Sequence, residues 1–475
     1  METANNLVID LTHGGVKIAI SLSKKGKKVY AHDIYNTLKT IDKEMLDVYD
    51  VELIDLTDLK NLTGDLKVIY PIHLPLSHEE IRKYNPDLNY EFITHHQAVK
   101  EILDGWGEDI LKVEITGVKG KTSSVFMLKE ILIDENPLIL SSLGSIIYED
   151  KKEKILKKNI SITPANIKET IDLAYKSANP ICKIANGTVE SENIRKYNSA
   201  IFETSLGACG IGDVGLLTNI AENYSIAQNR SDAATAKKLI FNCGIVVCEK
   251  ESFDMYYSDM PSDKVNTFSV ADKNANLYLE DVSCSLDETW IKIKFNNLKT
   301  IDENSIEGTL EVRTFAPGMH LVSNVLGVIT TALSLEIDCE KIINGLENYK
   351  GLEGRSNKKT IGNSIIIEEI NPVINTKAIE ESINMIKDFE NYYIAIGGDY
   401  GITCEEIDED KVRSFLDDND FNLILTGDVG KGIYEKMSKK PKLIANYEDV
   451  YDLAIDEGKN LLFIYRSDYK ELSKR

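Results

Sequence analysis

Short apolar runs alternate with amphipathic segments along most of the chain, which is the pattern of an α/β protein. Residues 7–11, 111–116 and 214–217 are short and mostly apolar, and we interpret them as buried strands of parallel sheets. Residues 125–132 carry apolar side chains at helical spacing, shortly after one of these runs. The chain is therefore predicted to consist of parallel strands joined by helices.

The strand pattern restarts twice, and this predicts three α/β domains in series. Residues 1–106 form a small Rossmann-like domain, residues 107–353 a central domain and residues 354–475 a second Rossmann-like domain. A length of 475 residues fits about three domains. Alternating segments between residues 276 and 313 predict hairpins inserted in the central domain. The strands expected in the outer domains lie at residues 7–11, 28–33, 51–54 and 67–70, and at residues 364–367, 393–396, 422–425 and 461–464.

The most informative segment is residues 111–124, which read LKVEITGVKGKTSS. A strand, a glycine loop, a Lys-Thr pair and a helix form a phosphate cradle, because the loop N–H groups and the helix N-terminus meet the phosphate oxygens. In such a loop the lysine reaches the β- and γ-phosphates and the hydroxyl binds Mg²⁺. The alternative is a strand–turn–helix that contains Gly-Lys-Thr by chance, but the flanking pattern favours binding of ATP and Mg²⁺. The residues predicted to bind ATP here are Thr116, Gly117, Val118, Lys119, Gly120, Lys121, Thr122 and Ser123.

The first expected strand is followed by a turn, Thr12-His13-Gly14-Gly15, and then by a helix that is predicted to reach Gly26. The segment lacks the GxGxxG pattern, so it gives little support to dinucleotide binding. Two alternatives stay open for the glycines. They let the backbone approach an anionic ligand, or they only allow a tight turn.

The composition disfavours several classes of partner. The formal net charge is −22, from 77 acidic and 55 basic residues, so neither nucleic acid nor an anionic membrane is expected to bind. No apolar run approaches the roughly 20 residues that span a bilayer. The polar N-terminus does not resemble a secretory signal, so a cytoplasmic location is expected. The seven cysteines are scattered without a CxxC pair, which favours reduced thiols over a disulfide or zinc framework.

Several ordered motifs resemble the Mur ligases, the ATP-dependent amide-forming enzymes of peptidoglycan synthesis. The phosphate loop has two residues between its glycines, as in the Mur pattern TGTxGKT, with Val118 in place of the second threonine. The resemblance covers most of the chain beyond residue 110, and it implies a three-domain Mur ligase-like architecture with a central P-loop ATPase domain. Further positions that match the family's motifs are Thr163-Pro164, Glu203, Thr218-Asn219-Ile220, Ala236-Lys237, Gly318, His320, Asn324 and Gly354-Arg355.

The resemblance implies a role for several of these residues. Thr122 and Glu203 would bind Mg²⁺, and a carbamylated Lys237 would bridge a second Mg²⁺. Asn324 would lie by the adenine, and Arg355 would reach the nucleotide phosphates. Charge neutralisation of this kind is needed because ATP and a carboxylate are both anions. The catalytic set that the resemblance implies is Lys121, Glu203, Lys237 and Arg355.

Three of the matched residues have a simpler alternative explanation. Glu203 is compatible with a solvated carboxylate at a strand end, although its place in a phosphate-loop protein favours the metal role. Lys237 is compatible with an ordinary surface lysine on a helix. Thr163 is compatible with a cap for a helix that starts at Pro164.

Two departures from the family pattern bear on the second substrate. Asn223-Tyr224 stands where the peptide-forming Mur ligases have an Asp-His pair, whose histidine binds the second metal. This leaves the ligands of that metal open, with Tyr224 or Glu222 as candidates. Residues 368–372, EEINP, replace the Asp-Tyr-Ala-His-Asn-Pro segment that helps to place nucleotide and incoming amine. The second departure argues against a standard amino-acid acceptor.

Four segments together resemble the coenzyme F-430 synthases of methanogenic archaea, a group of Mur ligase homologues. They are residues 9–15 (IDLTHGG), the Ser205-Leu206-Gly207 run after Glu203, residues 218–224 (TNIAENY) and the Asn371-Pro372 turn. That resemblance implies phosphorylation of a propionate carboxylate on a nickel seco-tetrapyrrole by ATP, followed by attack of a carbon of the same macrocycle on the acyl phosphate. The rivals are a pseudomurein-type peptide ligase and an ATP-binding assembly or sensor protein without ligase activity. A histidine on a polar helix is more often solvated than in contact with a ligand. The residues expected near the substrate are His13, Gly14, Gly15 and Thr163, with Lys17, His95 and His96 as further basic candidates.

Overall fold

The computed structural model describes residues 5–178, 195–226, 229–285, 288–352, 355–371, 374, 376–386, 390–401 and 407–467. The chain divides into two compact units. One comprises residues 1–280, 292–311 and 323–345, and the other comprises residues 281–291, 312–322 and 346–475. Gly354, Pro372 and the side chain of Arg355, which belong to the motifs named above, lie outside what is described.

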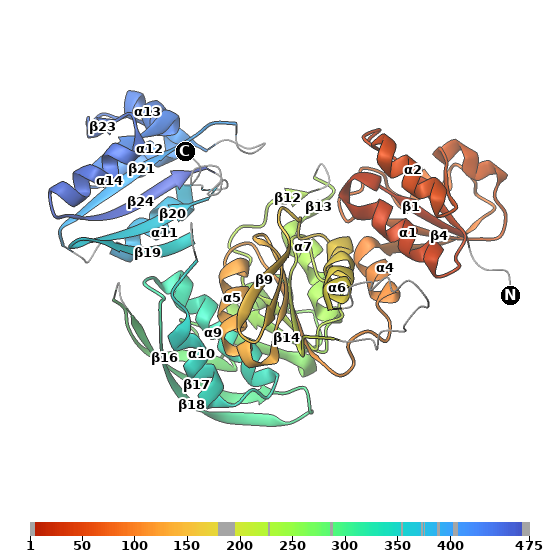
Figure 1. Ribbon diagram of the computed structural model, residues 1–475, viewed down its shortest axis with the longest axis horizontal. Helices are drawn as coiled ribbons and strands as arrows, with labels where there is room; N and C mark the ends of the chain where they lie inside the picture. Colours follow the sequence, from red (N-terminus) through yellow and green to blue (C-terminus); the bar gives the residue numbers. More distant parts are fainter. Residues whose placement is uncertain are drawn as a thin grey trace, which may run out of the picture. The chain divides into compact units, whose positions relative to one another are not determined.

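The first unit begins with a five-stranded parallel sheet (Figure 1). Its strand order within the described residues is β3-β2-β1-β4-β5. The strands that follow β1 in the sequence, β2 and β3, lie on one side of it, and β4 and β5 lie on the other side. The carboxyl ends of the neighbours β1 and β4 therefore flank a topological switch point. The strands are β1 Asn5–Ile9, β2 Val29–His32, β3 Val51–Leu53, β4 Asp65–Tyr70 and β5 Asn89–Thr94. The helices are α1 Val16–Lys24, α2 Thr40–Val48, α3 His78–Arg82 and α4 His95–Ile102.

The segment after β1 is more ordered than the simple turn expected there. Leu11–Gly15 forms a short irregular helical turn that continues directly into α1. Asp10 starts this turn with a φ of 71°, and its Oδ1 accepts the N–H groups of Thr12 (3.0 Å) and His13 (3.3 Å). The aspartate therefore fixes the path of the backbone where it leaves the sheet.

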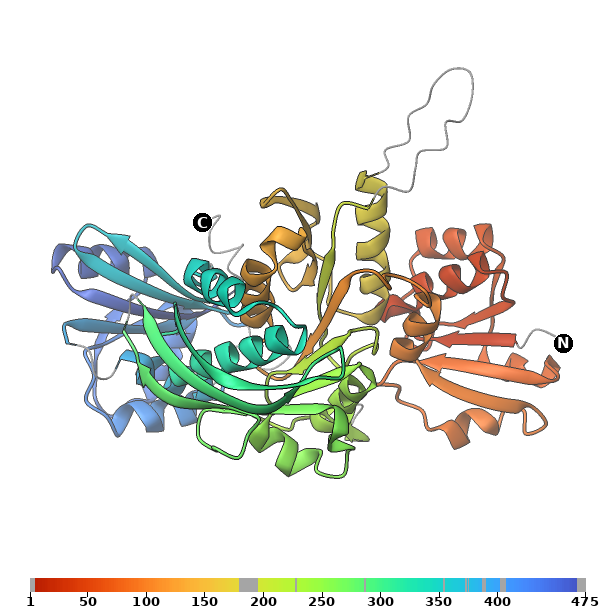
Figure 2. The same ribbon diagram turned by 90° about the horizontal axis from the view of Figure 1, so that it is seen from below.

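The central part of the chain forms a mixed sheet of order β18-β17-β16-β15-β14-β11-β6-β10-β7-β8-β9 in the described residues. β6 Leu111–Thr116 lies in its middle, parallel to β10 Ser199–Glu203 and β11 Val214–Leu217. The hairpin segments expected between residues 276 and 313 are strands of this sheet, and they form its long curved extension in Figure 2. The other strands are β7 Leu138–Ser141, β8 Gly144–Glu149, β9 Lys152–Lys157, β14 Ile245–Glu249, β15 Val265–Ser269, β16 Leu277–Ser283, β17 Thr289–Lys299 and β18 Ser305–Thr314, besides the separate pair β12 Ser225–Ile226 and β13 Ser231–Asp232.

One hydrophobic core joins the first sheet to the central sheet. Val99 of α4, Ile167 of α6 and Phe202 of β10 are fully buried members of a single cluster. Burial of this continuous apolar surface holds the two sheets in one unit. The helices of the central part are α5 Lys121–Ile131, α6 Pro164–Ala178, α7 Ala233–Lys237, α8 Lys250–Tyr256, α9 Met319–Ser334 and α10 Cys339–Asn348.

The second unit contains a sheet of order β19-β20-β24-β21-β22-β23 in its described part. β19 is antiparallel to β20, and the other neighbours are parallel. Leu461 and Phe463, alternate residues of β24, pack with Val450 and Ala454 of α14. The strands are β19 Arg355–Ile361, β20 Ser364–Ile370, β21 Tyr392–Gly398, β22 Leu423–Thr426, β23 Lys442–Ile444 and β24 Asn460–Arg466. The helices are α11 Thr376–Ile386, α12 Glu409–Asp417, α13 Gly427–Lys436 and α14 Tyr447–Asp456.

These three sheets confirm the predicted α/β class, with one Rossmann-like sheet before and one after a central sheet that carries the glycine loop. The domain boundaries at residues 106/107 and 353/354 stay predictions. Among the helices of the described residues, none is both long and apolar enough to cross a membrane.

Candidate active site

The predicted phosphate loop lies between β6 and α5, at the middle of the central sheet. Gly117 and Gly120 have φ values of 145° and 83°, in the region where a side chain is strained. A Cβ atom on Gly117 would lie 2.0 Å from Thr218 Oγ1, and one on Gly120 would lie 2.1 Å from Asn324 Oδ1. The shape of the loop therefore requires both glycines.

Thr218 and Asn219 follow the neighbouring strand β11 and brace the loop from the side. Asn219 accepts the N–H of Val118 at its carbonyl (3.0 Å) and the N–H of Lys119 at its side-chain oxygen (3.1 Å). Thr218 Oγ1 donates to the Lys119 carbonyl (2.6 Å). The Thr-Asn step thus fixes the loop backbone, a role that its motif alone did not indicate.

The remaining loop residues differ in what their side chains do. Lys121 Nζ donates to the Gly117 carbonyl (3.0 Å), so its charge lies over the loop. Thr116 is fully buried, and its Oγ1 donates to the Thr204 carbonyl (3.4 Å), so its hydroxyl serves the packing of the sheet. Ser123 lies in the first turn of α5.

The predicted magnesium ligands Thr122 and Glu203 lie side by side, although they are 81 positions apart in the sequence. Thr122 Oγ1 lies 3.1 and 3.2 Å from the two carboxylate oxygens of Glu203, and the Ser142 N–H donates to the same carboxylate (3.0 Å). Glu203 is only 2% exposed, so the alternative of a solvated strand-end carboxylate is wrong. A hydroxyl and a carboxylate are the oxygen donors that Mg²⁺ prefers, and the pair therefore fits this ion.

Lys237, the last residue of α7, is fully buried. Its Nζ donates to the Ser205 carbonyl (2.7 Å). Burial, and after it the charge of Lys121, lowers the pKa of Lys237 from 10.5 to about 7. The surface-lysine alternative is therefore wrong. A fraction of neutral amine near pH 7 is compatible with the carbamate that the resemblance implies.

Asn223 and Tyr224, which replace the Asp-His pair, lie beside Lys237. Asn223 Oδ1 accepts the N–H of Ala234 (2.9 Å) in the first turn of α7. The centre of the Tyr224 ring lies 6.0 Å from Lys237 Nζ. Asn223 therefore holds the helix that carries the lysine, and Tyr224 stands next to the predicted position of the second metal.

A cavity of about 330 Å³ lies where the first sheet meets the central part of the same unit. His13 and Thr163, two predicted substrate residues, line it together with His73, His96 and Ser205. Ser205 also carries the carbonyl that Lys237 contacts, so the cavity lies next to the predicted catalytic residues. Thr163 Oγ1 is buried and has no hydrogen-bond partner among the described residues, so this hydroxyl does not cap α6.

Gly14 and Gly15, the other two predicted substrate residues, allow close packing. Gly14 has a φ of 103°, and a Cβ atom there would lie 2.7 Å from the Cβ of Ala165 in α6. A Cβ atom on Gly15 would lie 2.1 Å from the Asp10 carbonyl. These contacts favour the tight-turn alternative over a role in approaching an anion.

The further basic candidates are either paired or buried. Lys17 forms an ion pair with Glu169. His95 and His96 are 2% and 5% exposed, and burial lowers their pKa values to about 4 and about 3. A ring nitrogen of His95 contacts the Ile9 carbonyl (3.0 Å). The expectation that these histidines are solvated is wrong, because α4 packs against the core of the unit.

Two residues that were predicted to bind the nucleotide remain, Asn324 and Arg355. Asn324 of α9 is 5% exposed and lies against Gly120 of the loop, as the glycine geometry shows. Arg355 begins β19 in the second unit, and its side chain lies outside the described residues. The nucleotide-binding role of both residues stays a prediction.

No motif in the sequence gave a role to Ser142, whose N–H donates to Glu203, or to Asp10 and His73 beside His13. Asp10 is fully buried, which raises its pKa, but hydrogen bonds with His73 and His13 outweigh burial and lower the pKa to about 2. A partial signal was present, because Asp10 directly follows a buried parallel strand, and functional side chains gather at such carboxyl ends.

Comparison with known proteins finds relatives along most of the chain. Residues 358–468 match a family model described as the C-terminal domain of coenzyme F430 synthetase CfbE. The chain is 29% identical over 440 residues to a coenzyme F(430) synthetase of Methanocaldococcus jannaschii. The aligned region covers 90% of this chain and 91% of that protein. It is 27% identical over 451 residues to the coenzyme F(430) synthetase of Methanosarcina acetivorans, with 86% of each chain covered. MurF of Acinetobacter baumannii has a similar structure, with a TM-score of 0.58 and 13% identity over 86% of this chain and 83% of that one.

The three sheets and the glycine loop at the head of the central one give the chain the fold of the Mur ligases. Within that class, the chain is a homologue of the coenzyme F430 synthetases along almost its whole length. The predicted resemblance, fold and enzyme class are therefore confirmed.

Proposed function

We propose that this protein is a coenzyme F430 synthetase, which uses ATP and Mg²⁺ to close a carbocycle on a nickel tetrapyrrole carboxylate. The observation that carries the proposal is its similarity to two such synthetases over 90% and 86% of the chain. The pair Thr122–Glu203 and the buried Lys237, both close to the glycine loop, support activation of a carboxylate.

In the first step, an oxygen of a propionate attacks the γ-phosphorus of ATP, the bond to ADP breaks and an acyl phosphate forms. Both reactants are anions, so the site has to neutralise charge in the transition state. Lys121 lies over the loop and would contact the β- and γ-phosphates, and Arg355 would add a second positive group. Mg²⁺ held by Thr122 and Glu203, and a second ion at a carbamylated Lys237, would neutralise further charge.

In the second step, a carbon of the same macrocycle loses a proton and attacks the acyl carbon. The bond between the acyl carbon and the phosphate oxygen breaks, phosphate leaves and a six-membered carbocycle closes. No external amine is used, in line with residues 368–372, which lack the acceptor segment of the amino-acid-adding ligases. The cavity lined by His13 and Thr163 would hold the macrocycle and keep water from the acyl phosphate.

The test combines purified protein with ATP, Mg²⁺ and the nickel seco-precursor, and follows the tetrapyrrole absorbance together with phosphate release. We expect both signals to change in parallel without any added amino acid. Turnover that requires an amino acid would replace the proposal with a pseudomurein-type peptide ligase. No phosphate release with any carboxylate would favour an ATP-binding protein without ligase activity.

A further inference from the structure

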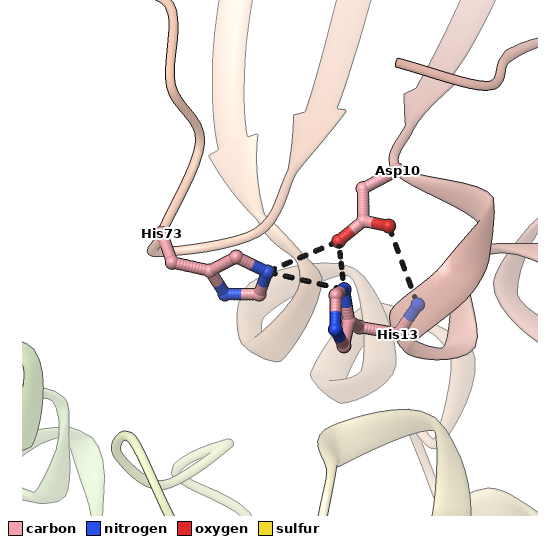
Figure 3. Close-up of side chains that lie close together, drawn as sticks. All are labelled: Asp10, His13 and His73. Atoms are coloured by element: carbon pink, nitrogen blue, oxygen red, sulfur yellow. Dashed lines mark hydrogen bonds and ion pairs between the residues drawn. The ribbon is translucent and has the colours of Figure 1, made fainter. Parts of the chain in front are cut away.

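Asp10, His13 and His73 bring three metal-ligating atoms together at the switch point of the first sheet (Figure 3). His13 Nδ1 lies 2.7 Å and His73 Nε2 lies 3.2 Å from Asp10 Oδ2, and the two nitrogens lie 3.2 Å from each other. His13 comes from the turn after β1, and His73 comes from the segment after β4. The cluster therefore occupies the crevice where open α/β sheets bind ligands.

Protons satisfy this triangle only when each ring presents an N–H to the same oxygen. If both ring nitrogens carry a proton, each donates to Asp10 Oδ2, and the two donor nitrogens lie 3.2 Å apart. If only one nitrogen is protonated, the lone pair of the other ring faces the carboxylate. A single cation between the three atoms would satisfy all of these contacts at once.

The dimensions of the triangle suit a metal ion. An ion with the ordinary bond length of about 2.1 Å to each atom would sit about 1 Å out of the plane of the three atoms. Two imidazoles and one carboxylate form a nitrogen-rich donor set, which zinc and other divalent first-row transition metals prefer over Mg²⁺ or Ca²⁺. Asp10 Oδ1 accepts the N–H groups of Thr12 and His13, so the other oxygen is held at the triangle.

A second observation at the same place also points to a ligand. His13 and His73 line the cavity of about 330 Å³, and so does His96. His96 is 5% exposed, and its Nδ1 has no hydrogen-bond partner among the described residues. Thr163 Oγ1, which also lines the cavity, is buried and likewise has no hydrogen-bond partner among the described residues. Buried polar atoms are normally paired, so these two atoms offer polar contacts to a bound molecule within a mostly apolar cavity.

We propose that Asp10, His13 and His73 bind a divalent transition metal ion, with zinc as the representative, and that its open coordination positions face this cavity. Three protein ligands leave at least one position for an oxygen of a bound molecule, and a carboxylate has the matching charge. The nickel of a tetrapyrrole does not suit this triangle, because its four equatorial nitrogens leave one axial position on each face. The site is therefore distinct from the metal of the proposed substrate, and it does not depend on the proposed reaction.

The experiment measures zinc binding to the full chain without nucleotide or tetrapyrrole. The protein is stripped with a chelator, its thiols are alkylated because Cys284 and Cys339 are exposed, and excess Mg²⁺ is added to occupy hard-ion sites. Calorimetric titration is expected to show one zinc ion per chain with a micromolar or lower Kd. Cobalt in place of zinc is expected to give the visible absorption of a nitrogen- and oxygen-ligated ion.

Matched variants assign the binding to the triangle. Asp10→Asn and His73→Gln each remove one ligand and are expected to weaken zinc binding by about 100-fold. His78→Gln is the control, because His78 belongs to the same sheet domain but stacks on Phe92, away from the cluster. This control is expected to keep the wild-type Kd. ATP binding by each variant shows that the chain is folded.

Two results would overturn the proposal. One is the lack of a zinc site with a Kd below millimolar in the wild-type chain. The other is a site whose affinity and cobalt spectrum survive both Asp10→Asn and His73→Gln, since the metal would then lie elsewhere. Because neither measurement uses ATP turnover, failure of the ligase assay leaves this test unaffected.

Discussion

Thr122 Oγ1 lies 3.1 Å from Glu203 Oε1, and the two residues lie at the carboxyl ends of two neighbouring parallel strands. Thr122 lies in the first turn of α5 just after β6, and Glu203 is the last residue of β10. Because the carboxyl ends of parallel strands meet at one edge of a sheet, the phosphate loop and the acidic ligand converge there. This relationship places a carboxylate where Mg²⁺ of a bound nucleotide is expected.

Replacement of Glu203 by glutamine keeps the size of the side chain and removes its charge. We expect Glu203→Gln to lower Mg²⁺-dependent phosphate release by at least about 100-fold, because one ligand of the charge-neutralising ion is lost. Thr122→Ser keeps the hydroxyl and is expected to retain activity, whereas Thr122→Val is expected to lose it. Phosphate release measured over a range of Mg²⁺ concentrations checks all three. An unchanged Mg²⁺ dependence in Glu203→Gln would rule out its metal role.

The charge of Lys121 over the loop gives a second prediction. Lys121→Ala is expected to abolish detectable phosphate release, because the positive group at the β- and γ-phosphates is lost. The control is Lys129→Ala, later in the same helix, where the ammonium group contacts Glu130. That variant is expected to stay within about twofold of wild type, as for most substitutions away from a site. Equal loss in both variants would indicate damage to α5 instead of a role at the phosphates.

The loop glycines allow strain to be separated from steric clash. Gly120→Ala combines a φ of 83° with a contact of 2.1 Å to Asn324 Oδ1. Gly105→Ala has a φ of 74°, but no atom of the described residues lies within 4 Å of its new Cβ. Gly105→Ala is therefore expected to cost only about 1–2 kcal/mol of stability and to leave ATP affinity unchanged.

Gly120→Ala is expected to be less stable than Gly105→Ala and to bind ATP at least about tenfold more weakly, because the loop or Asn324 has to move. Thermal unfolding and calorimetric titration with ATP measure the two effects. Wild-type ATP affinity in Gly120→Ala would show that this movement of the loop or of Asn324 does not impair ATP binding.

Much of the fold could be predicted because its signal is local. The apolar run 214–217 coincides with β11, and the Gly-Lys-Thr loop stands between a strand and a helix as its pattern requires. Strands β7 to β9 were not predicted. β9 is largely exposed at the sheet edge and reads KEKILK, so its assignment depends on pairing with β8 and not on its own pattern.

The candidate site was harder to predict, because burial and proximity are tertiary properties. Lys237 ends a short helix of sequence AATAK, which reads as a surface segment, and only the packed structure shows its burial. His95 and His96 likewise begin a helix that reads as polar. The pairing of Thr122 with Glu203 rested on family resemblance, since 81 positions separate the two residues and no spacing rule connects them.

The burial of Lys237 makes the stability of the protein depend on pH. Its pKa is about 7 in the folded chain and 10.5 for a free lysine, so between these values the unfolded chain binds more protons. The free energy of unfolding therefore gains a contribution that rises with pH from about 7 to 10.5. Below about pH 7 both states are protonated, and the full cost of burying the charge remains.

Lys237→Met removes this ionisable group, so it should stabilise the protein most at about pH 6 and least at about pH 10. We expect a gain of about 2–4 kcal/mol at the lower pH, given about 1.4 kcal/mol per pKa unit and some lost packing. Urea unfolding in CO₂-free buffer measures it without interference from carbamate. Lys238→Met is the control, because Lys238 pairs with Asp259 (2.9 Å) and is partly exposed, and it should change stability little at either pH. An equal gain for Lys237→Met at both pH values would show that burial does not lower the pKa of Lys237 in the folded chain.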